Sequence, residues 1–176
     1  MAEFLELPEE KPYREYLRGE VCEKAMPNRV HGELVIELGS LLRNYLRETD
    51  EGRVATEVRN AYQAGDWVFL PDLQVTLSGR LSRSEARGPV EVIPDLCIEV
   101  LSPDDRASKL FERVELYMRA GTRLLWVVDP EAETITAYRP GEVAIVHRGG
   151  AVMGAAPVLR DFKLDVGRLF EVVRDA

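Results

Sequence analysis

The sequence predicts a mixed α/β (α+β) domain in which helices flank a mixed central β-sheet. Two continuous apolar runs, at 96–101 and 124–129, have the length and composition of strands that are covered on both faces. A helical pattern lies between them, so we expect strand, helix and strand to form a right-handed parallel unit. The chain has 176 residues, of which 45% are hydrophobic. These values fit a single domain that spans residues 1–176.

The first half of the chain is predicted to contain one long helix followed by strands. Apolar side chains recur at helical spacing from 30 to 47, and Asn28 can cap the first turn. Alternating polarity at 54–58 then favours a strand. A turn at 64–66 precedes a further pair of strands within 67–77.

A polar segment at 78–89 separates the two halves of the chain. It holds Arg80, Arg83 and Arg87 among Ser and Gly residues and has little apolar content. This composition predicts a mobile loop. We expect the three arginines either to contact nucleic acid or to be merely solvated.

The second half is predicted to place a helix directly after the strand at 96–101. Ser102 and the acids that follow it are typical of a helix start, and Gly121 is typical of a helix end. The remaining elements follow in order: a strand at 124–129, a hairpin formed by 134–138 and 143–146, and a terminal element at 165–173.

Composition and charge narrow the classes of function. The formal net charge is −8, which disfavours tight, non-specific binding to nucleic acid but allows a local basic surface. No apolar stretch approaches the roughly 20 residues that a membrane span needs, and the first residues are acidic where a signal peptide would be basic. Cys22 and Cys97 form neither a disulfide framework nor a zinc-ligand pattern. We therefore expect a cytoplasmic protein without a membrane partner.

Glu99 is the most informative residue, because it lies inside an apolar run that predicts a buried strand. An ionised carboxylate in such a place costs several kcal/mol unless a cation or hydrogen bonds compensate it. Asp72 opens the strand pattern that begins upstream at 73, so two strand-borne acids predict a metal site. The alternatives are a structural ion pair between Glu99 and an arginine, and a turn at Asp72. Asp95 is expected to cap or turn and not to share the ion. Glu20, Glu33 and Glu37 are candidates for an additional acid near the metal, although acids on helices are usually solvated.

Several ordered blocks carry a family resemblance. They are Pro71-Asp72, the run 94–103, the run 109–117, Ala120-Gly121 and the run 126–130. Together they resemble the Uma2 family of bacterial proteins, which belongs to the PD-(D/E)xK restriction-endonuclease-like superfamily. The resemblance implies a restriction-endonuclease-like core and a nuclease that uses Mg²⁺, or Mn²⁺, to hydrolyse phosphodiester bonds, with DNA as the expected substrate.

The resemblance also assigns roles to individual residues. Asp72 and Glu99 match the two acidic motif positions and are expected to be catalytic metal ligands. The superfamily usually has a Lys two residues after the Glu, but this chain has Leu101 there. Uma2-like chains carry the Lys on the following helix, where this chain has Arg113, with Lys109 one turn earlier. We expect Lys109 to assist catalysis and Arg113 to hold phosphate or transition-state charge, because a guanidinium cannot act as a general base.

Further expectations concern substrate contact and assembly. His31 lies at the start of the first helix, where Uma2-like chains favour a His, and it could contact a phosphate or be a simple polar residue. A homodimer is an expected assembly, because nucleases that cut both strands are often two-fold dimers. Two alternatives to catalysis stay open: a non-catalytic nucleic-acid-binding module on the same fold, and a partner-binding protein in which Glu99 is only salt-bridged.

Overall fold

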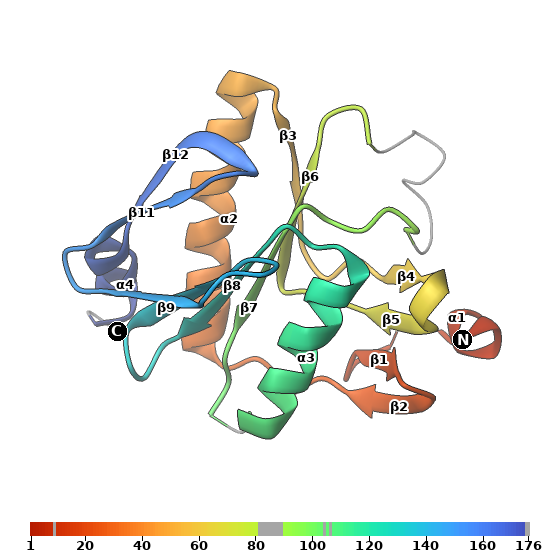
Figure 1. Cartoon of the computed structure of the whole chain (residues 1–176). Helices are drawn as coiled ribbons and strands as arrows, with labels where there is room; N and C mark the ends of the chain where they lie inside the picture. Colours follow the sequence, from red (N-terminus) through yellow and green to blue (C-terminus); the bar gives the residue numbers. More distant parts are fainter. Residues whose placement is uncertain (9, 81–89, 104, 106, 175–176) are drawn as a thin grey trace.

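The core of the protein is a six-stranded mixed sheet, seen in a computed structural model that describes residues 1–8, 10–80, 90–103, 105 and 107–174 (Figure 1). The strand order is β10-β9-β8-β7-β6-β3. β7 and β8 pair in parallel, and the other neighbours pair antiparallel, which confirms the predicted mixed sheet with a parallel centre. The strands are β3 (Gly52–Ala55), β6 (Leu73–Leu77), β7 (Leu96–Val100), β8 (Leu124–Asp129), β9 (Thr134–Tyr138) and β10 (Ile145–Arg148).

Helix α2 (Arg29–Thr49) covers one face of this sheet, as expected from its apolar spacing. The Asn28 side chain accepts a hydrogen bond from the His31 N–H at 2.8 Å, so the predicted cap is confirmed. Four buried leucines of α2 pack on the sheet, on the same side as Ile98 of β7. The terminal element is also a helix, α4 (Val166–Arg174), and it packs beside α2.

Helix α3 (Ala107–Ala120) covers the opposite face. Successive side chains of a strand point to opposite faces, so Ile98 faces α2 while Cys97 packs with Tyr117 of α3. The same alternation directs Glu99 toward α3. The helix ends at Gly121, whose φ of 101° is readily adopted only by glycine.

A second, smaller sheet was not predicted. Its order is β2-β1-β5-β4, and Leu17 and Phe69 from it pack with the α3 side of the core. The expected strand at 54–58 is shorter in the structure, because β3 ends at Ala55 and the chain crosses to this second sheet. The elements outside the central sheet are α1 (Ala2–Leu5), β1 (Arg14–Leu17), β2 (Glu20–Glu23), β4 (Asn60–Tyr62), η1 (Gln63–Gly65), β5 (Trp67–Phe69), β11 (Val152–Ala155) and β12 (Leu159–Asp165).

None of the helices within the described ranges combines the length and the apolar character that a membrane crossing requires.

Candidate active site

Asp72 and Glu99 lie side by side at the end of β6 and on β7. The antiparallel register pairs Leu73 with Ile98, and one step further along both strands brings Asp72 opposite Glu99. Both side chains are buried, with 5% and 3% of each residue exposed. The expected convergence of the two acids across adjacent strands is therefore confirmed.

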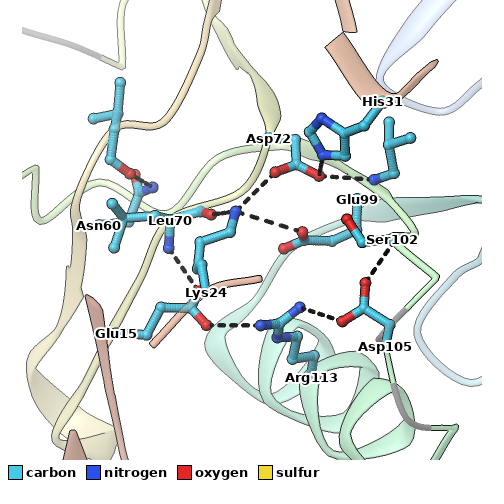
Figure 2. Close-up of polar contacts among 12 residues, drawn as sticks. Glu15, Lys24, His31, Asn60, Leu70, Asp72, Glu99, Ser102, Asp105 and Arg113 are labelled. Atoms are coloured by element: carbon cyan, nitrogen blue, oxygen red, sulfur yellow. Dashed lines mark hydrogen bonds and ion pairs between the residues drawn. The ribbon is translucent and has the colours of Figure 1, made fainter. Parts of the chain in front are cut away.

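The cation between these acids is Lys24, which directly follows β2 (Figure 2). Its Nζ lies 2.8 Å from Asp72 Oδ1 and 3.8 Å from Glu99 Oε2. The same ammonium donates to the Leu70 carbonyl at 2.5 Å, so three oxygens surround it. Burial by itself would lower the pKa of Lys24, but the charges of Glu99 and Asp72 outweigh burial and raise that pKa. Lys24 is therefore held in its charged form.

Asp72 is held by donors on its other oxygen as well. Asp72 Oδ2 accepts a hydrogen bond from the Val100 N–H at 2.8 Å, and His31 Nε2 lies 3.1 Å from it. Burial alone would raise the pKa of Asp72, but Lys24 and His31 lower it well below its usual range. The structure thus brings His31 to the site through the first turn of α2.

Glu99 is less well compensated than Asp72. The Tyr117 hydroxyl of α3 donates to Glu99 Oε1, and Lys24 is the more distant neighbour of its other oxygen. Burial raises the pKa of Glu99 to about 7, against the lowering effect of Lys24, and the nearby charge of Asp72 adds to the rise. Burial and Glu99 also raise the pKa of Tyr117, so the phenol keeps its proton.

Glu15 and Arg113 form the second charged pair of the cluster. Glu15 of β1 is 1% exposed, accepts from the Leu70 N–H at 3.0 Å, and lies 3.3 Å from Arg113 Nη2. Arg113 also lies 3.9 Å from Asp105 Oδ1. Burial would lower the pKa of Arg113, but Glu15 and Glu99 raise it further above its usual range. Arg113 thus reaches the site as predicted, whereas Glu15 was missed by sequence reasoning.

The remaining predicted residues lie elsewhere. Lys109 is exposed on α3, and the lysine in contact with the acids is Lys24, so the structure does not bring Lys109 to the cluster. Arg80 is exposed and pairs with the buried Asp95 at 2.7 Å. Asp95 also accepts from the Leu77 N–H, which agrees with its expected local structural role. Arg83 and Arg87 lie outside the described residues.

The oxygen atoms around Lys24 are of the kind that ligate a hard divalent cation. Two carboxylates and one backbone carbonyl already surround a positive charge, and oxygen ligands of this kind are those that Mg²⁺ prefers. Within the described ranges, however, no three His, Cys, Asp or Glu side chains converge closely enough to form a complete metal cage. The residues fit a two-carboxylate site that is completed by solvent or substrate oxygens.

Comparison with known proteins identifies the family of the chain and a solved structure with the same fold. The Uma2 family, described as "Putative restriction endonuclease", matches residues 1–167. The chain belongs to the Uma2 family. A crystal structure of a DUF820 protein from Anabaena variabilis ATCC 29413, described as a putative nuclease, superposes with a TM-score of 0.90. It is 28% identical, and the alignment covers 98% of this chain and 97% of that one.

Other comparisons contribute less. A cryoEM structure of a DrdV–DNA complex matches at a TM-score of 0.37 and 15% identity, over 79% of this chain and 11% of that chain, and carries no argument here. A search of the curated proteins found no match. The Uma2 assignment and the Anabaena structure together support a nuclease and confirm the predicted fold class.

The raised pKa of Glu99 predicts that this Uma2 protein, without metal, loses stability as the pH rises. Folding favours protonated Glu99. Its contribution to the free energy of unfolding is therefore fully present below its ordinary pKa of 4.5 and is lost as the pH rises through about 7. From pH 5 to 8 the free energy of unfolding should fall by about 2 to 3 kcal/mol through this group. Urea titrations in chelator should show the fall in the wild type and a much smaller one in Glu99→Gln. Parallel curves for the two proteins would contradict the shift.

Proposed function

We propose that this protein is a divalent-metal-dependent endonuclease that hydrolyses phosphodiester bonds, with DNA as its substrate. The observation that carries the proposal is the convergence of Asp72, Glu99 and Lys24 from three separate segments of the chain, with Lys24 in contact with both acids. Two acids and one lysine in contact constitute the residue set that the superfamily uses for phosphodiester cleavage. The lysine comes from a different segment than the sequence suggested.

The charge balance of the cluster supports a place for a further cation. Three buried carboxylates, on Asp72, Glu99 and Glu15, face the cations Lys24 and Arg113, and His31 lies beside Asp72. Adjacent carboxylates in a buried site are costly: burial raises the pKa of Glu99, and the charges of Asp72 and Glu15 raise it further. Asp72 and Glu99 would hold Mg²⁺ or Mn²⁺, which would lower the pKa of a water and offset charge on the scissile phosphate.

The protein's own residues have distinct roles in this proposal. Lys24 has a flexible stem, so its ammonium can remain next to the acids and donate to an attacking water or to the phosphate. A hollow of about 20 Å³, lined in part by Lys24, His31 and Asp72, has room for one water molecule. His31 lies at this hollow and would donate to a phosphate oxygen. Arg113 stays with Glu15 and fixes the position of the β1 strand against α3.

A second candidate function is a non-catalytic nucleic-acid-binding module. The observation that favours it is the contact of Lys24 with both acids, because an ammonium can neutralise them without a metal. In this case the ammonium of Lys24 permanently takes the place of the metal ion. Such a protein would bind nucleic acid but would not cleave it.

Nicking of supercoiled plasmid separates the two candidates. We expect nicking with Mg²⁺ or Mn²⁺ and none in chelator. Asp72→Asn should lower the rate by about 10³-fold, because a lost metal ligand removes several kcal/mol of transition-state stabilisation. Asp161→Asn is the matched control. Asp161 is exposed on β12, so this variant should cleave at the wild-type rate.

The result that would overturn catalysis is the absence of metal-dependent cleavage of plasmid, single-stranded DNA and RNA by folded wild-type protein. Equal rates for Asp72→Asn and the wild type would also overturn the assignment, because a contaminating nuclease would then account for the activity. Cleavage of RNA alone would leave the chemistry in place and replace DNA as the substrate.

A further inference from the structure

A large groove runs between helix α2 and the edge strand β3, and the proposed function does not use it. Its volume is about 830 Å³. Its lining includes Leu73, which follows Asp72 in the chain, and Val35, one helical turn beyond His31, so it approaches the active site along the chain on the α2 side of the sheet. Helix α2 and strand β3 supply most of its lining, and Figure 1 shows the chain leaving the upper end of α2 and turning into β3.

Three exposed arginines line this groove: Arg43 and Arg47 on α2, and Arg53 on β3. Within the described part of the chain, none of them forms an ion pair with an acid, and Asp50 is the acid that shares the lining. Arg43 and Arg47 are four residues apart, so two like charges lie on one helix face, which disfavours the helix. This local positive charge contrasts with the net charge of −8 for the whole chain.

Part of the groove lining is apolar. Ile36, which is 71% exposed, Val54 and the buried Leu73 contribute to it. β3 is one of the two edge strands of the sheet, so alternate backbone N–H groups face outward and have no ladder partner among the described strands. A lining that combines cations with apolar side chains suits a nucleic-acid strand, which carries phosphates on one edge and less polar sugars and bases on the other.

We propose that this groove binds a single strand of nucleic acid, with its phosphates paired to Arg43, Arg47 and Arg53. The volume is in the range of pockets that enclose small ligands, which is enough for a short stretch of one strand and too small to enclose a duplex. The strand would lead from the groove to Asp72 and Glu99. This last step rests on the proposed nuclease function, whereas the binding itself does not.

Fluorescence anisotropy with a labelled single-stranded DNA oligonucleotide tests the proposal in chelator, where cleavage is blocked. Arg43→Gln/Arg47→Gln/Arg53→Gln should weaken binding at least tenfold at moderate salt. The slope of log affinity against log salt should also fall by about two, since each phosphate contact on a single strand contributes about 0.7. The control changes the net charge equally, at exposed arginines that do not line the groove: Arg148→Gln/Arg160→Gln/Arg168→Gln.

The outcomes separate this proposal from the proposed function. Equal binding by the groove variant and the control variant, both with wild-type melting temperatures, overturns the groove. Duplex bound as tightly as the single strand, or an acidic peptide bound in preference to it, also overturns it. Groove-dependent binding by a wild type that never cleaves supports the groove and removes the nuclease. Cleavage by a wild type whose binding does not depend on the groove supports the nuclease and overturns the groove.

Discussion

Lys24→Met is expected to lower plasmid nicking by about 10² to 10⁴-fold, the usual contribution of a side chain that positions or transfers a proton in the transition state. The ammonium that contacts Asp72 and Glu99 would be lost, and among the described residues no other lysine forms an ion pair with these acids, although Lys11 lines the same small hollow. Lys109→Met is the matched control. Its side chain is exposed, so nicking should stay near the wild-type rate.

The opposite ranking would overturn this assignment. If Lys109→Met lost activity while Lys24→Met kept it, the lysine of α3 would be the functional one and Lys24 a structural counter-ion. Melting temperatures with and without Mn²⁺ provide the folding control. Metal should raise the melting temperature of Lys24→Met at least as much as that of the wild type, because its two acids then have no ammonium to displace.

Arg113→Met is expected to lower the free energy of unfolding by about 3 to 5 kcal/mol, because it leaves buried charge on Glu15 without its partner. Urea denaturation measures this loss. Arg119→Met is the control, since Arg119 pairs with Glu115 on the exposed side of the same helix and such pairs contribute less than about 1 kcal/mol.

A double variant tests the cause of the loss. Glu15→Gln/Arg113→Met removes both charges, so it should recover part of the stability that Arg113→Met loses. A double variant that is as unstable as the sum of the two single variants would show that Arg113 acts through packing of its stem and not through charge.

The central sheet could be predicted because its signals are local. The helix of 29–49 shows its period within the segment, and β7 and β8 are apolar runs that can only be buried. Asp72 and Glu99 could be predicted for the same reason, since an acid inside or next to such a run requires compensation. Their convergence followed once the two strands were taken as neighbours.

The rest of the site could not be predicted in this way, because it depends on a contact between distant segments. Glu15 and Lys24 lie on or beside strands of four residues, β1 and β2, whose pattern is too short to show that they dock on the core. One signal was available: the chain has only four lysines, and Lys24 is one of them. Helical spacing relates Lys109 to Arg113, whereas nothing in the sequence relates Lys24 to Asp72.

The β1–β2 hairpin brings one charge of each sign to the core, and this pattern dictates how it can dock. Glu15 accepts from the Leu70 N–H, while Lys24 donates to the carbonyl of the same residue. If the hairpin docked with these two residues exchanged, Glu15 would meet Asp72 and Glu99, and Lys24 would meet Arg113. Every such contact would be repulsive in a poorly solvated environment. The buried charges therefore favour one orientation of the hairpin and disfavour the one in which Glu15 and Lys24 are exchanged. This holds even where their attraction adds little net stability.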